Sequence, residues 1–244
     1  MVPFISVVIP AYDEASRLPK TIRRIQEYLK AKSLSFEIII VDDGSKDQTV
    51  DVAKNCLNGS SHLVLTNERN RGKGYCVKKG MLAASGKYVL FSDADLSTPI
   101  EEIERMFPHL ENGYDVVIGS RAISDPTVKR KIWWYREIMG RTYNLLGQWI
   151  LFPGIQDSQC GFKCFKHDVA RNLFSRQKLE GFSFDGEILF LARRHGYRIK
   201  EIPINWIRDD RSKVKLVKDS IRMFFDLIKV RLIHQKSEST STKQ

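Results

Sequence analysis

The sequence predicts an α/β protein with a mostly parallel central sheet and helices on both faces. Short β-branched runs alternate with helical patterns through the first half of the chain, which is typical of right-handed βαβ units. Acidic clusters directly follow three of these runs, as expected for a ligand crevice outside the carboxyl ends of parallel strands. The 244 residues, 42% hydrophobic and 28% charged, suit a single folded domain.

The first half of the chain should supply five strands and the helices between them. The strands are short apolar runs of the kind that a parallel sheet buries on both faces. They are expected at residues 5–10, 37–41, 62–65, 88–91 and 116–118. Helical patterns between them predict helices at 16–31, 47–57, 73–84 and 100–111.

The second half is less regular. Basic residues are interleaved with tryptophan and tyrosine over 124–153. A strand is expected at 160–166, a helix at 184–195, and an extended pair, interrupted by Pro203, at 198–207. We find no internal repeat and no linker rich in Pro, Gly or Ser, so the sequence predicts one domain over 1–214.

The C-terminal residues have a different character. An amphipathic helix is expected at 215–233, and the polar residues 234–244 are expected to be disordered. No run of about 18 uncharged apolar residues is present, so we expect no ordinary transmembrane helix. The first ten residues lack the basic and small-residue features of a secretory signal.

The charge balance favours an anionic partner. Lys and Arg number 40 against 29 Asp and Glu, which gives a formal net charge of +11. Nucleic acid, acidic phospholipid and a phosphorylated substrate all fit this surplus. Four cysteines in a chain of this length exclude a disulfide-dense secreted scaffold.

Asp93 and Asp95 are the most informative pair of residues. They follow the apolar run at 88–91, and Pro99 then lies near the first turn of the next expected helix. A short acidic turn in solvent would have the same residues, but this context places the pair at the rim of the crevice. Two carboxylates there can bind Mg²⁺ or Mn²⁺, which take diphosphate oxygens in their remaining positions.

A second acidic cluster begins at Asp42 and Asp43. Ser45 and Asp47 are explained by capping of the helix that follows, but the two preceding acids are not. An acid at the carboxyl end of a strand can accept a hydrogen bond from a base N–H or a ribose hydroxyl. Asp42 is therefore a candidate for nucleoside binding.

A basic, glycine-containing loop lies between the two acidic clusters. In residues 69–74 (RNRGKG), glycine lets the backbone approach a phosphate, and Lys73 adds a charge at a helix N-terminus. The spacing is not that of a Walker A loop. A solvated basic turn explains the same residues equally well.

The order of these motifs resembles the family 2 inverting glycosyltransferases, which have the GT-A fold with a Rossmann-like sheet. The motifs that carry the resemblance are residues 10–14 (PAYDE), 41–45 (VDDGS), 70–74 (NRGKG) and 93–95 (DAD). Three further motifs are similar to the branch of dolichyl-phosphate β-glucosyltransferases and polyprenyl-phosphate sugar transferases: 93–99 (DADLSTP), 119–121 (GSR) and 157–163 (DSQCGFK). The resemblance covers roughly residues 4–216.

The resemblance implies that residues 1–121 bind the nucleotide-sugar and 122–214 the acceptor. The donor residues by this match are Pro10, Ala11, Tyr12, Glu14, Asp42, Asp43, Lys73, Asp93 and Ala94. Asp93 and Asp95 match the metal-binding pair, so Mg²⁺ or Mn²⁺ is the expected cofactor. One departure in this half is Asp13, where the family usually has Asn.

The expected acceptor site is basic. Its phosphate-binding residues would be Arg121, Arg136, Arg208, Ser212 and Lys213, and the catalytic residues would be Asp157, Gln159, Asp95 and Arg121. In the branch a glycine often precedes the Ser-Lys pair, whereas this chain has Arg211 there.

The acceptor decides whether a general base is needed. A phosphate monoester, with a second pKa of about 6, is largely dianionic at pH 7 and needs cations rather than a base. A sugar hydroxyl must lose a proton during attack, and Asp157, Asp185 or Glu187 could then accept it. Asp185 and Glu187 are equally well explained as charges that complement a helix dipole.

The leading interpretation is transfer of glucose, or a similar hexose, from a UDP-sugar to dolichyl or another polyprenyl phosphate. Transfer to a soluble saccharide acceptor on the same fold is the alternative. A nucleic-acid-binding protein is disfavoured because the paired acids would repel phosphates unless a metal is bound. A nucleotidyltransferase is disfavoured because residues 10–14 are not glycine-rich.

Two segments have the composition of membrane-interfacial helices. Residues 129–152 and 216–233 combine Lys and Arg with large apolar side chains. We expect peripheral contact with an anionic membrane on its cytoplasmic face. For the second segment, packing onto the domain or onto a second subunit is an equal alternative.

Overall fold

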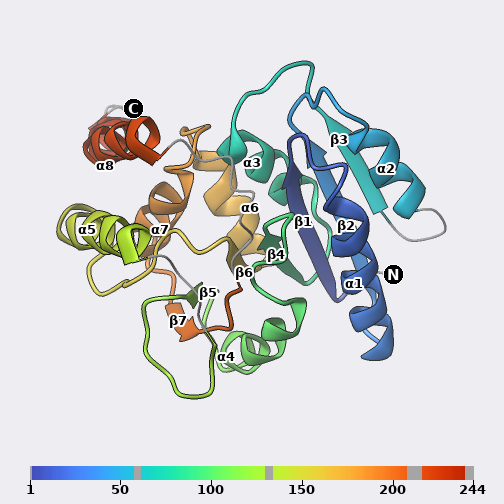
Figure 1. The fold of residues 1–244 in the computed structure, drawn as a ribbon. Coiled ribbons are helices and arrows are strands. Elements are labelled where there is room, and N and C mark those ends of the chain that lie inside the picture. The colour runs from blue at the N-terminus through green and yellow to red at the C-terminus, as the bar shows by residue number, and fades with distance from the viewer. Residues whose placement is uncertain (1, 58–61, 130–133, 208–215, 240–244) are drawn as a thin grey trace.

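The fold is built on a seven-stranded sheet in the order β3-β2-β1-β4-β6-β5-β7 (Figure 1). The computed structural model describes residues 2–57, 62–129, 134–207 and 216–239 of the chain. The strands are β1 (Ile5–Ala11), β2 (Phe36–Asp42), β3 (His62–Thr66), β4 (Tyr88–Ser92), β5 (Val116–Ser120), β6 (Phe162–Lys166) and β7 (Ile199–Pro203).

Six of the strands share one direction, and β6 runs against them. β1 pairs in parallel with β2 and β4, and β5 pairs in parallel with β7. β6 lies between β4 and β5 and is antiparallel to both. Its first residue, Phe162, is therefore opposite Ser92, the last residue of β4. The residues just before β6 consequently meet those just after β4 at one edge of the sheet.

Helices cover both faces of the sheet because alternate strand residues point to opposite sides. Ile5, Val7 and Ile9 pack into one apolar cluster, whereas Val8 packs into the other. The first face carries α1 (Leu18–Ala31), α2 (Thr49–Cys56), the 3₁₀ helix η1 (Ile100–Arg105) and α4 (Phe107–Glu111). The second face carries α3 (Lys73–Ala83), α6 (His167–Arg176) and α7 (Phe184–Arg194).

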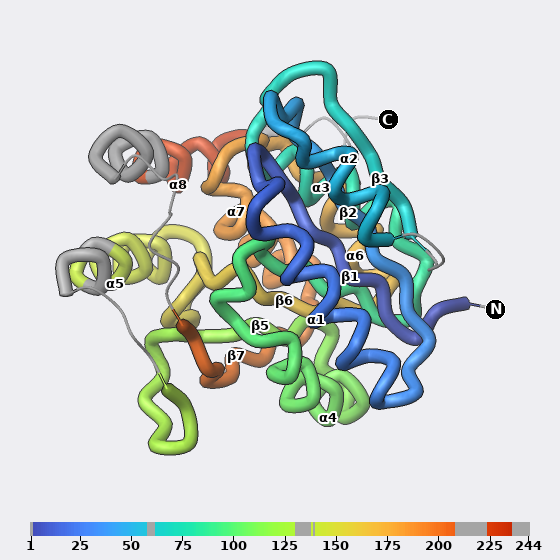
Figure 2. Tube along the Cα trace, turned by 45° about the vertical axis from the view of Figure 1, so that its right-hand side comes forward, coloured from blue at the N-terminus to red at the C-terminus, as the bar shows by residue number. Residues whose placement is uncertain are grey.

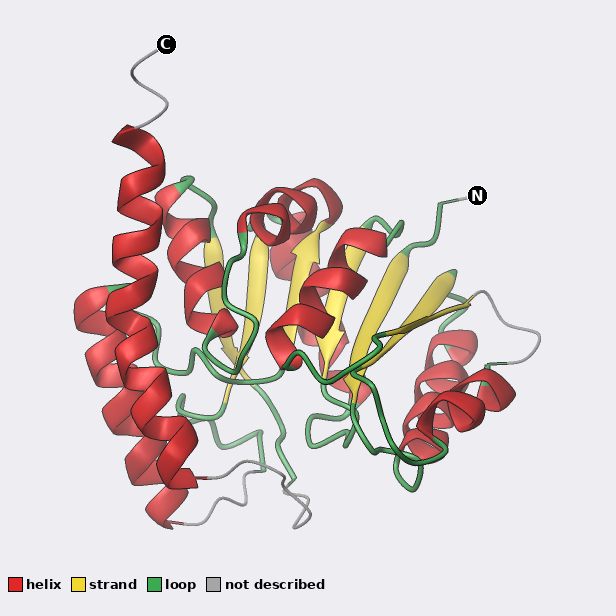
Figure 3. Cartoon of the chain, turned by 90° about the horizontal axis from the view of Figure 1, so that it is seen from above, coloured by secondary structure: helices red, strands yellow, loops and turns green. Residues whose placement is uncertain are grey.

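Two long helices lie outside α7 at one flank of the molecule. These are α5 (Trp134–Ile150) and α8 (Leu216–Ser239), which lie side by side in every view (Figures 1, 2 and 3). On α8, Leu227 and Val230 are buried against the body, whereas Phe225, Ile228 and Leu232 are exposed. Among the described residues, no helix is both long and apolar enough to span a bilayer.

The predicted α/β class and mostly parallel sheet are confirmed, with differences at three places. The helix expected over 100–111 is split into η1 and α4, because Pro108 cannot donate the backbone hydrogen bond that would continue it. Between 198 and 207, only residues 199–203 form a strand of the sheet.

The third difference concerns the C-terminus. α8 continues to Ser239, although residues from 234 onward were predicted to be disordered. His234 is only 6% exposed, and its contacts with the body hold this extra turn. Residues 240–244 lie outside the described part of the chain.

Candidate active site

Asp93 and Asp95 lie directly after β4, beside the lysine that begins α3. The Nζ atom of Lys73 is 2.6 Å from Oδ1 of Asp93. The backbone N–H of Asp93 donates to the carbonyl oxygen of Gly161 at 3.2 Å. A Cβ atom on Gly161 would lie 1.9 Å from the Asp93 carboxylate, so only glycine allows this approach. The sheet register thus brings three of the predicted motifs together.

The surroundings of Asp95 disfavour its negative charge. Burial raises the pKa of its carboxyl, and the neighbouring charge of Asp93 raises it further. A cation bound by both carboxylates would remove this repulsion, so the donor set fits a hard divalent ion such as Mg²⁺ or Mn²⁺. Among the described residues, no cluster of three or more His, Cys, Asp or Glu side chains is placed to hold a metal. The remaining ligands would have to be water or diphosphate oxygens.

Lys73 is positioned by the glycine before it. Gly72 has a φ of 111°, a conformation that favours glycine, and it serves as the N-cap of α3. Burial lowers the pKa of Lys73, but the charges of Asp93 and Asp185 outweigh burial and raise it overall. A fixed cation therefore lies at the N-terminus of a helix, where backbone N–H groups also favour an anion.

Asp42, at the end of β2, accepts hydrogen bonds from the described residues through only one of its two carboxylate oxygens. It is 2% exposed, and its Oδ2 accepts hydrogen bonds from the backbone N–H groups of Gly44 and Ser45, at 3.1 and 3.2 Å. Its buried Oδ1 has no hydrogen-bond partner among the described residues. Buried carboxylate oxygens are nearly always hydrogen-bonded, so we expect Oδ1 to accept a hydrogen bond from a ligand or a water molecule.

Asp43 is bonded to the chain itself. Its carboxylate accepts hydrogen bonds from the backbone N–H groups of Arg71 and Gly72, at 2.9 and 2.7 Å. Its own backbone N–H donates to Ala11 at the end of β1. The structure therefore places Asp43 beneath the basic loop, where it shapes the approach to Lys73.

The loop after β1 is tied to the loop after β2. The backbone N–H of Asp13 donates to Ser45 Oγ at 2.8 Å, and that of Glu14 donates to Thr49 Oγ1 at 2.8 Å. Asp13 has a φ of 49° and accepts a bond from the N–H of Lys46. Asp13 thus joins the two loops at the position where the family usually has Asn.

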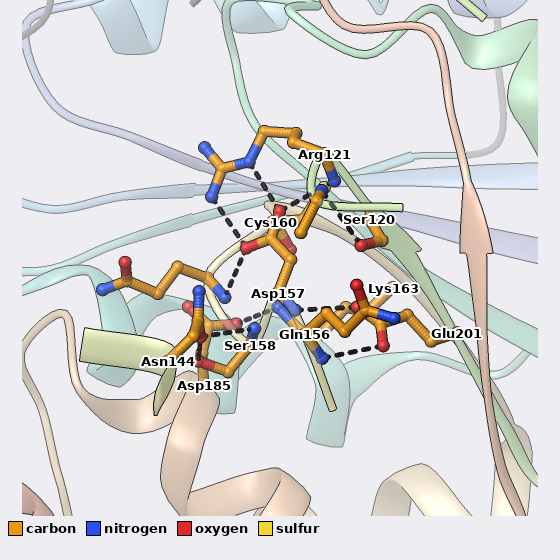
Figure 4. A network of polar contacts seen from close by, with 12 residues as sticks. Ser120, Arg121, Asn144, Gln156, Asp157, Ser158, Cys160, Lys163, Asp185 and Glu201 are labelled. Carbon is orange, nitrogen blue, oxygen red and sulfur yellow. Dashed lines mark hydrogen bonds and ion pairs between the residues drawn. The ribbon is translucent and has the colours of Figure 1, made fainter. Parts of the chain in front are cut away.

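Arg121 and Asp157 form a bidentate ion pair at the far end of the site (Figure 4). Nε of Arg121 is 2.7 Å from Oδ2 of Asp157, and Nη2 is 2.9 Å from Oδ1. The backbone N–H of Arg121 donates to the same carboxylate at 2.9 Å. Burial alone would raise the pKa of Asp157, but the charge and hydrogen bonds of Arg121 outweigh it and lower that pKa. Asp157 is therefore ionised and oriented.

The loop that carries Asp157 is held by two residues that no motif indicated. Glu201 on β7 accepts hydrogen bonds from the N–H groups of residues 156 and 157, at 2.9 and 2.7 Å (Figure 4). Asn144 on α5 accepts bonds from the backbone N–H and Oγ of Ser158, at 3.0 and 2.7 Å. Both lie in stretches with ordinary helix or strand patterns, so the sequence alone gave no signal for them.

A buried ion pair lies beneath the site. Nζ of Lys163 is 2.5 Å from Oδ1 of Asp185 and 2.6 Å from the carbonyl oxygen of Cys160. Both charged side chains are almost fully buried. Lys163 belongs to the 157–163 motif, and its partner Asp185 lies in the first turn of α7. The pair connects β6 to α7 on the second face of the sheet, and the bond to Cys160 adds the loop before β6 to this contact.

For the other predicted site residues the structure gives fewer contacts, and some of them lie outside the described part of the chain. Pro10 and Ala11 end β1, Tyr12 follows them half-buried, and the carbonyl of Ala94 accepts a bond from Thr21. The backbone N–H of Gln159 donates to Asp157 Oδ1 at 3.2 Å. Arg136 falls within α5, but its side chain lies outside the described part, as do residues Arg208, Ser212 and Lys213 altogether.

Solved structures share this fold. The mannosyl-3-phosphoglycerate synthase from Rubrobacter xylanophilus aligns with a TM-score of 0.72 at 19% identity, covering 98% of this chain and 75% of that one. A second solved structure is a glucosyl-3-phosphoglycerate synthase from Mycobacterium tuberculosis in complex with Mn²⁺, UDP-glucose and phosphoglyceric acid. It aligns with a TM-score of 0.68 at 22% identity, covering 94% of this chain and 79% of that one. The predicted GT-A fold is thereby confirmed.

Sequence relatives are closer. Dolichyl-phosphate beta-glucosyltransferases from Dictyostelium discoideum and Saccharomyces cerevisiae are both 36% identical to this chain. The alignments cover 93% and 95% of this chain and 74% and 75% of the relatives. The human enzyme of the same name is 34% identical over 93% of this chain and 75% of its own length. Residues 6–174 match glycosyl transferase family 2. The chain therefore belongs to glycosyltransferase family 2 and is a glycosyltransferase.

Proposed function

We propose that this glycosyltransferase transfers glucose from UDP-glucose to dolichyl or another polyprenyl phosphate, with inversion at the anomeric carbon. The names of the relatives support the donor sugar and the acceptor class. The observation that carries the proposal is the Arg121–Asp157 ion pair, because it holds the guanidinium in a fixed orientation at the expected acceptor site and engages the acid that would otherwise serve as the base.

The donor would lie at the carboxyl ends of β1, β2 and β4. Asp42 would accept a hydrogen bond from the uracil, since its Oδ1 has no protein donor among the described residues. Asp93 and Asp95 would hold Mg²⁺ or Mn²⁺, and the bound ion would stabilise charge on the leaving diphosphate. Lys73 and the first turn of α3, which lie beside Asp93, would contact the same diphosphate.

The acceptor would lie beside Arg121. A phosphate dianion needs no proton removed before it attacks, so the site must supply cations and orientation. Asp157 supplies the orientation, because its bidentate contact fixes the guanidinium plane. A hydroxyl acceptor would need a base, and the three acids considered for that role are all engaged: Asp157 with Arg121, Asp185 with Lys163, and Glu187 with backbone N–H groups.

The acceptor lipid would be reached from a membrane surface. The outer face of α8 exposes Phe225, Ile228 and Leu232, and the adjacent α5 exposes Leu145 and Trp149, the latter 88% exposed. The exposed side chains of Arg141, Lys229 and Arg231 lie among them. We infer that this surface rests on anionic lipid at the cytoplasmic face of a membrane, with the apolar side chains in the headgroup region.

The test is a transfer assay with matched acceptors. The protein would be incubated with Mg²⁺ and UDP-glucose, with either a short polyprenyl phosphate, the same polyprenol without phosphate, or a soluble saccharide. We expect glucose to appear only on the phosphorylated lipid, with one UDP released for each glucose transferred. Transfer to the saccharide alone would contradict the proposal, and release of UDP without a glycosylated lipid would indicate hydrolysis.

A further inference from the structure

The segment 177–183, which connects α6 to α7, lies directly against the first turn of α3. A Cβ atom on Gly72 would be 2.5 Å from the carbonyl oxygen of Glu180. A Cβ atom on Gly74 would be 2.7 Å from the carbonyl oxygen of Gly181. Both flanks of the lysine that begins α3 therefore rest on this segment, and neither glycine can be replaced without moving it.

Hydrogen bonds fasten the same contact. The backbone N–H of Tyr75 donates to the carbonyl of Glu180 at 3.1 Å. Nε2 of Gln177 donates to the carbonyls of Gly74 and Leu179, at 2.9 and 2.7 Å. Gln177 is 2% exposed, so water does not compete strongly for these bonds. A shift of the 177–183 segment would be transmitted to the start of α3.

Glu187 on α7 holds the segment from the other side. Its Oε1 accepts a hydrogen bond from the backbone N–H of Lys178, and its Oε2 accepts one from that of Leu179, both at 2.8 Å. The side chain is fully buried. A buried carboxylate is costly unless its charge and lone pairs are satisfied, so a further partner is expected.

That partner comes from α8, 47 residues further along the chain. Nε2 of His234 is 2.6 Å from Oε1 of Glu187, and the imidazole is itself buried. Because the carboxylate is the acceptor, the Nε2 atom carries the proton. Nη1 of Arg194 donates to the backbone carbonyl of His234 at 2.8 Å, which fixes this turn of α8 on α7.

A second contact joins α8 to the same segment. Oγ of Ser183 donates to Oδ2 of Asp226 at 2.7 Å. Asp226, Val230 and His234 are spaced four residues apart and therefore form one stripe along the inner face of α8. The outer face of this helix carries the exposed apolar side chains described above.

We propose that Glu187 and His234 are positioning residues of the donor site, through which α8 fixes the 177–183 segment and thereby Lys73. This inference rests on the proposed function for the role of Lys73 at the donor diphosphate. In this role neither residue would touch the donor itself. Their effect would pass from α8 to the carboxylate, from the carboxylate to two backbone N–H groups, and from there to the start of α3.

The experiment measures UDP binding by calorimetry with Mg²⁺, which requires neither lipid nor turnover. His234→Leu removes the donor, and we expect the Kd for UDP to rise by more than about twofold and by up to about fivefold, the limit set by the loss of one buried hydrogen bond. His234→Gln restores an N–H near the position of Nε2 and should bind within about twofold of the wild-type protein. Gln235→Ala, an exposed neighbour on α8, is the matched control and should bind UDP unchanged.

Hydrogen exchange provides a second measurement without nucleotide. The backbone N–H groups of Leu179 and Tyr75 should exchange faster in His234→Leu than in the wild-type protein or in His234→Gln. If His234→Leu does not fold, Glu187→Gln, which keeps the side-chain shape, takes its place with the same expectations.

The outcomes separate the two proposals. If Lys73→Met binds UDP as tightly as the wild-type protein, the proposed role of Lys73 is wrong, and faster exchange at Tyr75 alone would then support the link to α8. If Lys73→Met weakens UDP binding but His234→Leu and Glu187→Gln do not, the positioning role is overturned. A lower Tm with unchanged UDP affinity would assign both residues to stability alone.

Discussion

Asp95 and Asp157 are two aspartates of one site whose surroundings shift their pKa values in opposite directions. Asp95 is buried next to another carboxylate, which raises its pKa. Asp157 is more deeply buried, but Arg121 donates three hydrogen bonds to it and its pKa is lowered. One carboxylate is thus prepared to receive a cation, and the other already has one. Two substitutions test this contrast.

Asp95→Asn should abolish glucose transfer without destabilising the fold. The amide cannot replace a charged metal ligand, so we expect turnover to fall by about a thousandfold or more. The substitution also removes repulsion with Asp93, so the Tm should stay the same or rise. A clear fall in Tm would show that the negative charge of Asp95 stabilises the empty protein, which contradicts the electrostatics described here.

Asp157→Asn should destabilise the protein by roughly 2 kcal/mol at pH 7, less than for a fully buried pair because Arg121 keeps some contact with solvent. The native pKa of Asp157 is lowered, so the stability it contributes is present above the unfolded value and is lost as pH falls through the native value. The stability difference between the two proteins, measured by urea unfolding, should be constant from pH 7 to 5 and narrow below about pH 4. A difference that does not change with pH would contradict the lowered pKa.

Strand β6 shows what the sequence could and could not predict about an element. The apolar pattern of 160–166 predicted a strand, but pattern alone carries no strand direction. Its antiparallel placement between β4 and β5 is what brings Gly161 against Asp93 and Asp157 against Arg121. The motifs therefore named the individual residues as candidates, whereas their pairing could be seen only from the sheet topology.

Helices α5 and α8 should carry the membrane contact. The double substitution Phe225→Ser and Leu232→Ser removes two exposed apolar side chains from α8 without touching its buried face. We expect the affinity for anionic vesicles, measured by flotation at several lipid concentrations, to fall by about a hundredfold or more, because each buried apolar side chain contributes about 1.5–3 kcal/mol. Leu63→Ser, which changes an exposed leucine on β3, is the control and should float like the wild-type protein. Equal flotation of all three proteins would place the contact elsewhere.

Over the whole molecule, the sequence predicted the architecture well because its signals are local and repeated. Strand runs, helical patterns and the acidic turns at strand ends each follow from short stretches of chain. Glu201, Asn144 and His234 were not predicted as site-supporting residues, because each contacts a different element of the fold, 14 to 47 residues away in sequence. Contacts of that kind depend on packing, which a single sequence does not display.

The net charge of +11 gives a further prediction for the molecule as a whole. Binding to vesicles that contain acidic lipid should weaken strongly between 0.1 M and 0.5 M NaCl, because salt shortens the Debye length below about 10 Å. Neutral phosphatidylcholine vesicles should bind less at both salt concentrations. Binding that is independent of both salt and lipid charge would show that the apolar face acts alone.

Removal of divalent cations should stop transfer but leave the protein folded. Lys73 offers a positive charge to Asp93 from within the chain, so we expect the structure of the site not to depend on metal. We therefore expect EDTA to abolish glucose transfer and to shift the Tm by no more than about 2 °C, and excess Mg²⁺ to restore activity fully. Unfolding in EDTA would mean that the ion has a structural role.

The Lys73–Asp93 contact has a consequence for how the protein folds. The chain itself supplies a charged partner for the Asp93 carboxylate, so folding should not require a divalent cation. Protein refolded from urea in EDTA should therefore regain full activity once Mg²⁺ is added.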